Sequence, residues 1–184
     1  VASTCNEALL NFYLIENAKD KNEKAYLINH FLDSFKGTVY RQTMFAEFEK
    51  KAHEMAESGK SLTAKALNEM YYELNKQYFG PDMVVDKDIE VEWARIPHFY
   101  TPFYVYQYAT GFSAAVAIAS MIRKEGQPAV DDWKKVLAAG STKPPVELAA
   151  MAGIDISTDE PLLDTIETIG DMIDEICRLT DELN

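Results

Sequence analysis

Glycines divide this sequence into segments whose apolar residues recur with the period of an α-helix. Six of the eight glycines stand where such a segment should end: Gly37, Gly59, Gly80, Gly126, Gly140 and Gly153. Glycine favours a helix end because, without a Cβ atom, it adopts the left-handed conformation at little energetic cost. Between these positions the apolar spacing is close to 3.6 residues. The pattern predicts an all-α fold with several helices.

Helix boundaries follow from this spacing and from capping residues. The predicted helices cover residues 2–18, 23–36, 38–58, 64–79, 102–124, 128–138, 145–151 and 160–182. Thr63 is the expected cap of the helix 64–79, because its hydroxyl oxygen can accept a hydrogen bond from a free backbone N–H. Thr101 and Pro102 are expected to open the helix 102–124, since a proline at the first position loses no helical hydrogen bond.

Residues 81–97 interrupt the helical period with Pro81 and the pair Val84–Val85. This segment is expected to form a loop, which can include one short extended stretch. No internal repeat, low-complexity run or flexible linker separates other parts of the chain. Residues 1–184 are therefore predicted to form a single helical unit.

The charge of the chain argues against binding to nucleic acids. Thirty acidic and 18 basic residues give a net charge of −12, whereas phosphate binding needs a basic face. Much of the acid lies in residues 155–184. That segment fits the solvated face of a helix, and an acidic tail that binds a partner is the alternative.

Cysteine usage and hydropathy indicate a cytoplasmic protein. The two cysteines, Cys5 and Cys177, lie near opposite ends of the chain and are expected to be reduced, buried residues, because a disulfide framework uses more cysteines at closer spacing. The longest apolar stretch, Ala114–Ile122, is too short to span a bilayer. No signal peptide is recognisable, and no membrane association is expected.

The three histidines allow every candidate metal site to be checked. The segment from His53 to Glu57 imitates the HExxH motif of zinc peptidases but ends in glutamate, so one of the two imidazoles is missing. No glutamate stands three residues before His30, His53 or His98, which excludes the Glu-x-x-His motif of di-iron bundles. No metal ligands are assigned to this chain.

Aromatic residues gather around His98. Residues 93–112 contain eight of the 21 aromatic side chains, and Tyr104 and Tyr108 are four residues apart, on one face of a helix. Buried tyrosines need partners for their hydroxyl groups. The segment fits an aromatic core with hydroxyls at its rim, or the wall of a cleft in which imidazole and phenol groups meet a substrate.

The same segment carries a family resemblance. The run from Arg95 to Gly111, RIPHFYTPFYVYQYATG, resembles the C-terminal region of oligoendopeptidase F, a family of zinc metallopeptidases related to thimet oligopeptidase. Three further stretches agree in the same order: Val1–Leu10, Arg41–Glu49 and Leu62–Glu69. The resemblance covers nearly the whole chain.

This resemblance implies the C-terminal portion of a zincin-like oligopeptidase catalytic domain. In the family, HExxH lies on one helix and a third zinc ligand, a glutamate, directly precedes the segment matching Val1–Thr4. The chain would then lack the HExxH segment and every zinc ligand. The resemblance implies zinc in the full-length enzyme, an oligopeptide substrate, and a missing N-terminal part as partner. By itself the chain would bind no zinc and be inactive.

The resemblance also assigns roles to single residues. His98 and Tyr104 would stabilise the oxyanion that forms when zinc-bound water attacks a peptide carbonyl, and Tyr100 and Tyr108 would contact the substrate. Whether Tyr100 or Tyr104 faces the oxyanion is left open, because the thimet branch carries its tyrosines on a glycine-rich loop.

Two further expectations complete the interpretation. Glu7 would orient a zinc-bound imidazole if a ligand preceded Val1 on the same helix, since position seven then shares its face. A solvated glutamate is the alternative there. The competing hypothesis for the whole chain is a non-catalytic, all-helical protein-interaction module.

Overall fold

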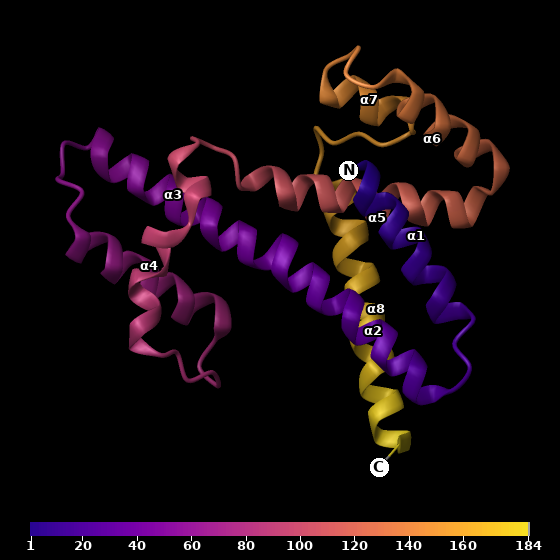
Figure 1. The fold of residues 1–184 in the computed structure, drawn as a ribbon, viewed down its shortest axis with the longest axis horizontal. Coiled ribbons are helices and arrows are strands. Elements are labelled where there is room, and N and C mark those ends of the chain that lie inside the picture. Colours follow the sequence, from indigo (N-terminus) through magenta and orange to yellow (C-terminus); the bar gives the residue numbers. More distant parts are fainter. Residues whose placement is uncertain (184) are drawn as a thin grey trace. The chain divides into compact units, whose positions relative to one another are not determined.

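The computed structural model describes residues 1–183, and these form helices without any β-strand (Figure 1). The α-helices are α1 (Ala2–Glu16), α2 (Lys21–Phe35), α3 (Arg41–Glu57), α4 (Ala64–Phe79), α5 (Tyr106–Glu125), α6 (Gln127–Ala139), α7 (Pro145–Met151) and α8 (Glu160–Leu183). A π-helical turn, η1 (Lys36–Tyr40), and two 3₁₀ helices, η2 (Lys87–Arg95) and η3 (Pro97–Tyr100), complete the secondary structure of this range. The predicted all-α class is confirmed.

The chain folds into two compact units, whereas the sequence predicts one. Unit 1 combines residues 1–39 with the segment from residue 110 onwards, and unit 2 comprises residues 40–109. Apolar spacing could not reveal this division, because unit 1 is assembled from two segments separated by the whole of unit 2. That residues 1–184 form the C-terminal portion of a catalytic domain stays a prediction.

The interior of unit 1 is built around α5. Its residues Phe112–Ala119 are all buried, and the rings of Phe112 and Phe31 lie 6.0 Å apart. Helix α8 packs on α2, and ion pairs join the two helices along their contact. Lys24 Nζ lies 2.5 Å from Glu175 Oε1. Hydrogen bonds from Arg178 and from Lys24 lower the pKa of Glu175 to about 2.

Unit 2 has its own aromatic core between α3, α4 and η2. The buried members of this core are Met44, Phe45, Phe48, Tyr71, Leu74, Ile96 and Val105. Polar groups at its edge are paired: Trp93 Nε1 donates to Asn68 Oδ1 at 2.8 Å, and the Tyr71 hydroxyl donates to Glu92 Oε2 at 2.6 Å. Buried polar atoms need such partners to avoid a desolvation penalty. Each unit therefore has an apolar interior of its own.

Several predicted boundaries agree with the structure. Thr63 caps α4, its Oγ1 accepting a hydrogen bond from the Ala66 N–H at 3.2 Å, and α7 has the predicted bounds. Five of the six glycines have positive φ. Gly37 is the exception, since it lies inside the π-helical turn η1 and ends no helix.

Within residues 81–97, a 3₁₀ helix lies where the sequence predicts a loop with an extended piece. Helix η2 covers Lys87–Arg95, and the Asp86 side chain caps it by accepting a hydrogen bond from the Asp88 N–H at 3.0 Å. The acidic residues of this segment therefore supply the cap, Asp86, and a partly buried carboxylate, Glu92, that accepts the Tyr71 hydroxyl.

The predicted start of the helix at residues 101–102 is wrong. Helix α5 begins at Tyr106, and Thr101 has an extended backbone with φ −116° and ψ 102°. Phe103 adopts a left-handed conformation with φ 56°, which no α-helix tolerates. Its N–H donates to Glu49 Oε1 at 2.7 Å. This contact joins positions 54 residues apart in the sequence, and the left-handed turn at Phe103 is incompatible with a helix that starts at Pro102.

The two cysteines lie in different environments. Cys5 is fully buried on α1, and burial raises the pKa of its thiol to about 11. Cys177 is exposed on α8, contrary to the expectation that it is buried, because it does not lie on the face of that helix that packs inward. None of the helices within residues 1–183 combines the length and apolar character needed to cross a bilayer.

Candidate functional site

The end of η3 and the start of α5 bring together three of the predicted site residues. His98 lies on η3, Tyr108 lies in the first turn of α5, and Tyr104 lies in the short segment that joins these helices. Buried residues fix this segment at both ends. Ile96 is 7% exposed, and Val105 is fully buried in the core of unit 2. The segment between these residues is therefore attached to the core of unit 2 at both ends.

The rings of His98, Tyr104 and Tyr108 contact one another, and we call them the His98 cluster. The His98 imidazole stacks on the Tyr104 ring, with centroids 5.5 Å apart and an interplanar angle of 19°. Tyr108 meets His98 edge-on at 6.1 Å and Tyr104 edge-on at 5.6 Å. Edge-to-face and offset arrangements at these separations are favourable for aromatic rings.

The His98 cluster lies at the surface, whereas Trp93 and Phe99 of the same segment pack against the core of unit 2. Tyr104 is 38% exposed and Tyr108 is 37% exposed, and His98 is exposed as well. A hydrogen bond with Tyr104, and then burial, raise the pKa of the Tyr108 phenol. Both effects favour the protonated phenol, so Tyr108 keeps its hydroxyl hydrogen at neutral pH. The cluster thus presents imidazole and phenol groups to solvent.

Tyr100 lies apart from the cluster. It ends η3 with 77% of its surface exposed, and it takes part in none of the three ring contacts that define the cluster. Of the two tyrosines between which the sequence could not decide, Tyr104 is the one that stacks on His98.

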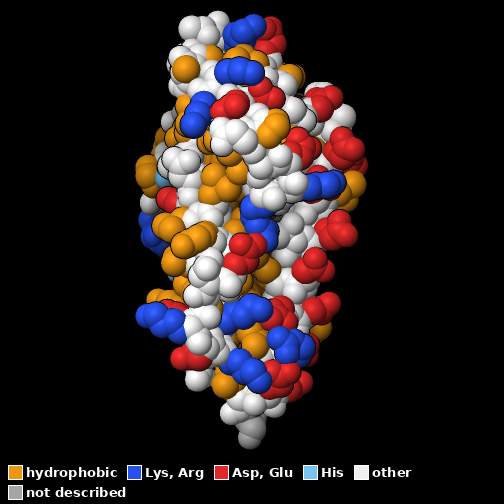
Figure 2. Space-filling view, turned by 90° about the vertical axis from the view of Figure 1, so that its right-hand side faces the viewer, with side chains coloured by type: hydrophobic (Ala, Val, Ile, Leu, Met, Phe, Trp, Pro, Cys, Tyr) orange, Lys and Arg blue, Asp and Glu red, His pale blue; other side chains and the backbone are white. Residues whose placement is uncertain are grey.

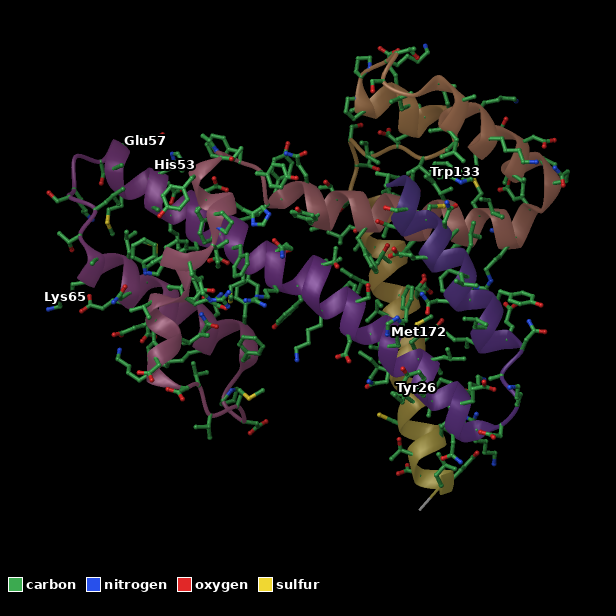
Figure 3. The ribbon with its side chains drawn as sticks, viewed as in Figure 1. Tyr26, His53, Glu57, Lys65, Trp133 and Met172 are labelled. Carbon is green, nitrogen blue, oxygen red and sulfur yellow. The ribbon has the colours of Figure 1, made fainter. Side chains whose placement is uncertain are left out.

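Two contacts beside the cluster were not predicted. The carboxylate of Glu49 accepts the Phe103 N–H, and the Phe103 ring lies against the His53 imidazole with centroids 4.8 Å apart. His53 projects from α3 near Glu57, as Figure 3 shows. In the sequence, His53 stood out only as part of an incomplete HExxH match, and the separation of four residues between Glu49 and His53 was the signal that the two share a helix face.

Glu7 lies on α1 in unit 1, where its side chain is exposed. Its backbone oxygen accepts a hydrogen bond from Asn11 Nδ2 at 2.9 Å. A role in orienting a metal-bound imidazole stays a prediction.

The residues that the structure describes do not fit a zinc site. Within residues 1–183, no three side chains of the types His, Cys, Asp and Glu are grouped so that they could hold a metal ion. His30 belongs to unit 1, and His53 and His98 belong to unit 2. Catalytic zinc takes three protein ligands, and these 183 residues offer no such set.

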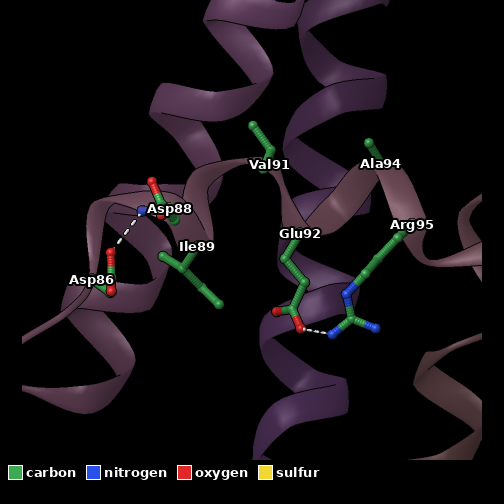
Figure 4. A pocket seen from close by; sticks show the side chains of 7 residues that line it. All are labelled: Asp86, Asp88, Ile89, Val91, Glu92, Ala94 and Arg95. Carbon is green, nitrogen blue, oxygen red and sulfur yellow. Dashed lines mark hydrogen bonds and ion pairs between the residues drawn. The ribbon is translucent and has the colours of Figure 1, made fainter.

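A surface pocket of about 680 Å³ lies on η2 (Figure 4), and none of the predicted site residues lines it. It is lined by Asp86, Asp88, Ile89, Val91, Glu92, Ala94 and Arg95. Glu92 is paired with two guanidinium groups, those of Arg41 and Arg95, and with the buried Tyr71 hydroxyl. These contacts satisfy the Glu92 carboxylate, so its role is to join η2 to α3 and α4.

Charges of both signs are mixed over the face drawn in Figure 2, with apolar side chains between them. Basic side chains form no extended patch on that face, in keeping with the net charge of −12.

Comparison with known proteins identifies relatives along nearly the whole chain. The model of peptidase family M3 matches residues 1–168. Oligopeptidase PepF of Bacillus subtilis is 51% identical over 179 residues, which are 97% of this chain and 27% of that protein. The plasmid oligoendopeptidase F of Lactococcus lactis subsp. cremoris is 41% identical over 182 residues, which are 99% of this chain and 30% of the relative.

Solved structures agree with this assignment. The crystal structure of oligoendopeptidase F from Enterococcus faecium superimposes with a TM-score of 0.94 at 44% identity, covering 98% of this chain and 35% of that one. A putative peptidase from Chlamydophila abortus gives a TM-score of 0.88 at 36% identity. The chain spans less than a third of the length of the curated relatives named above. Because the family model matches most of its residues, the chain belongs to peptidase family M3.

Proposed function

We propose that the protein containing this chain hydrolyses peptide bonds in oligopeptides, and that this chain supplies part of the wall of the substrate cleft. The single observation that carries the proposal is the exposed His98 cluster. Its rings form one surface, and its polar groups are hydrogen-bond donors. The similarity to oligoendopeptidase F supports the same activity.

In this proposal His98 and Tyr104 act on the oxyanion. When water attacks a peptide carbonyl, the carbonyl oxygen becomes negatively charged, and nearby N–H and O–H donors stabilise that charge. Each donor placed in this way contributes roughly 3–4 kcal/mol to transition-state stabilisation. Tyr108 and Tyr100 are proposed substrate contacts. The exposed position of Tyr100, away from the cluster, supports Tyr104 as the donor.

The metal and the compartment also belong to the proposal. By its resemblance to the family, the full-length protein uses zinc, and the ligands lie outside this chain, because the residues described in its structure form no such site. The chain by itself is then inactive. The cytoplasm is the proposed compartment, because both cysteines are free and a reducing environment keeps them so.

The test measures kcat, KM and thermal stability in the full-length protein. His98→Ala and Tyr104→Phe should each reduce kcat by an amount equivalent to about 2–4 kcal/mol and leave KM nearly unchanged, because the interaction strengthens only in the transition state. Tyr108→Phe should act mainly on KM. Tyr26→Phe is the control, since Tyr26 is a 70% exposed tyrosine in unit 1.

A different result would contradict the proposal. If His98→Ala and Tyr104→Phe lower the melting temperature but leave kcat near that of the unmodified protein, the cluster has a structural role only. If Tyr100→Phe loses kcat while Tyr104→Phe keeps it, the family function stands and the choice of tyrosine is wrong.

A further inference from the structure

The backbone beside the His98 cluster is held in an unfavourable conformation. Phe103, which directly precedes Tyr104, is the one non-glycine residue with positive φ among residues 1–183. A left-handed backbone is disfavoured for a residue with a Cβ atom, and such strain persists only where surrounding contacts impose it. Contacts from elsewhere in unit 2 must therefore hold this turn.

Helix α3 supplies two such contacts from one of its faces. Glu49 accepts the Phe103 N–H at 2.7 Å, and His53, one helical turn later, packs its imidazole on the Phe103 ring at 4.8 Å. Residues four apart on a helix are neighbours on its surface. The same face of α3 thus contacts both the backbone and the side chain of Phe103.

The burial of Glu49 makes the backbone contact a strong one. Glu49 is 7% exposed, although glutamate is rarely buried to this extent without a partner. A hydrogen bond between a backbone N–H and a carboxylate is shorter and stronger than one between neutral groups. Breaking it would leave a buried acceptor without its partner, so the carboxylate favours the turn in the conformation observed.

Tyr104 is constrained from both sides. Phe103 on one side is held by α3, and Val105 on the other is fully buried in the core of unit 2. The ring of Tyr104 therefore has little freedom to leave the His98 imidazole, on which it stacks at 5.5 Å. We propose that Glu49 is a positioning residue, which fixes Phe103 in its left-handed turn and thereby sets the Tyr104 hydroxyl for the reaction. Its effect on activity rests on the proposed function.

The experiment uses variants of the full-length protein. Glu49→Leu removes the acceptor at similar volume and should lower kcat at least tenfold, with KM changed by less than threefold. Glu49→Gln keeps an acceptor oxygen without the charge and should lower kcat by only two- to fivefold. Glu47→Gln is the matched control: Glu47 lies on the same helix and accepts the Tyr78 hydroxyl at 2.8 Å. It should leave kcat within twofold.

A second substitution, Phe103→Gly, distinguishes a positioning role of Glu49 from a general effect of Glu49 on stability. Glycine adopts positive φ at little cost, whereas alanine does not. Phe103→Gly in the Glu49→Leu background should therefore recover at least fivefold in kcat, while Phe103→Ala in that background should recover nothing. Both changes remove the phenyl ring, so their difference reports on the backbone alone. Equal kcat in the two double variants would overturn the proposal.

Hydrogen exchange provides a second readout. If Glu49→Leu fails to fold, Glu49→Gln decides the question, because a neutral acceptor should speed exchange of the Phe103 amide several-fold while the amides of α4 keep their protection. Unchanged exchange of that amide would overturn the proposal.

The failures of the two proposals are distinguishable. If Tyr104→Phe loses kcat while Glu49→Leu keeps it, the oxyanion role stands and positioning by Glu49 is wrong. If Tyr104→Phe keeps kcat, the proposed role of Tyr104 is wrong, and the exchange of the Phe103 amide still tests whether Glu49 holds the turn.

Discussion

Replacing Tyr71 by phenylalanine should destabilise unit 2 by an amount that the structure bounds. Tyr71 is fully buried, and its hydroxyl donates to Glu92 Oε2 at 2.6 Å. A hydrogen bond to a charged group contributes about 1.5–3 kcal/mol. In the variant Arg41 and Arg95 still pair with Glu92 through Oε1, whereas Oε2 loses the Tyr71 hydroxyl. We therefore expect a loss of about 2 kcal/mol in the free energy of unfolding.

The two tryptophans allow this loss to be measured in one unit. Trp93 belongs to unit 2 and Trp133 to unit 1, and the sequence contains no others. Trp133 Nε1 has no hydrogen-bond partner within residues 1–183, so Trp133→Phe removes the unit 1 signal without leaving a donor or acceptor of that range unpaired. In that background, Tyr71→Phe should lower the urea midpoint reported by Trp93 by about 1 M, for a slope of ~2 kcal/mol/M.

Tyr72→Phe is the matched control on the same helix. The Tyr72 hydroxyl lies 3.5 Å from its acceptor, the backbone oxygen of Val85, a distance at which a hydrogen bond contributes little. Its loss should change the free energy of unfolding by less than about 0.5 kcal/mol. If Tyr71→Phe and Tyr72→Phe shift the midpoint equally, the Tyr71–Glu92 bond does not stabilise unit 2 as argued.

The same bond predicts a dependence on alkaline pH. Burial, and then the hydrogen bond to Glu92, raise the pKa of Tyr71 above its ordinary value of 10. A raised pKa means that the folded state keeps the proton more tightly than the unfolded state. The stabilisation is therefore complete below pH 10 and declines as the pH rises above it. Tyr71→Phe should lose less stability between about pH 9 and 11 than the unmodified protein.

Two further predictions concern unit 1. Hydrogen bonds from Arg178 and then Lys24 lower the pKa of Glu175 to about 2, from 4.5, so its stabilisation is present above pH 4.5 and lost as the pH falls towards 2. The urea midpoint of Glu175→Gln should lie below that of the unmodified protein at neutral pH and approach it at about pH 2–3. If the difference between the two midpoints stays the same over this pH range, the predicted stabilisation by the ion pairs of Glu175 is wrong. Gly153→Ala should cost about 1–2 kcal/mol, because Gly153 has φ +81° and an added Cβ would lie 3.3 Å from a methionine side chain. Gly170→Ala, inside α8 with open space around it, should instead stabilise the protein by about 0.5–1 kcal/mol. If both glycine substitutions shift the melting temperature in the same direction, these two predictions are wrong.

The features that depend on neighbouring residues could be read from the sequence. Thr63 caps α4 because a side chain three positions away meets a free N–H, and α7 begins at Pro145 as predicted. The cap and the helix start are short-range consequences of helical geometry, for which sequence spacing is sufficient. The aromatic run around His98 also indicated which side chains gather, although Tyr104 precedes α5 and so lies on no helical stripe.

Only the tertiary structure decided the features that join distant segments. Helix α5 starts after a left-handed turn at Phe103, whose N–H is bonded to Glu49 across 54 residues. Unit 1 is assembled from two segments that are separated in the sequence by residues 40–109. The sequence by itself determined an all-α chain and the Thr63 cap, and it indicated the aromatic residues of the candidate His98 cluster. It could not determine which buried carboxylate satisfies which backbone N–H, because that depends on how helices pack, and helix packing is not encoded in the spacing along any single helix.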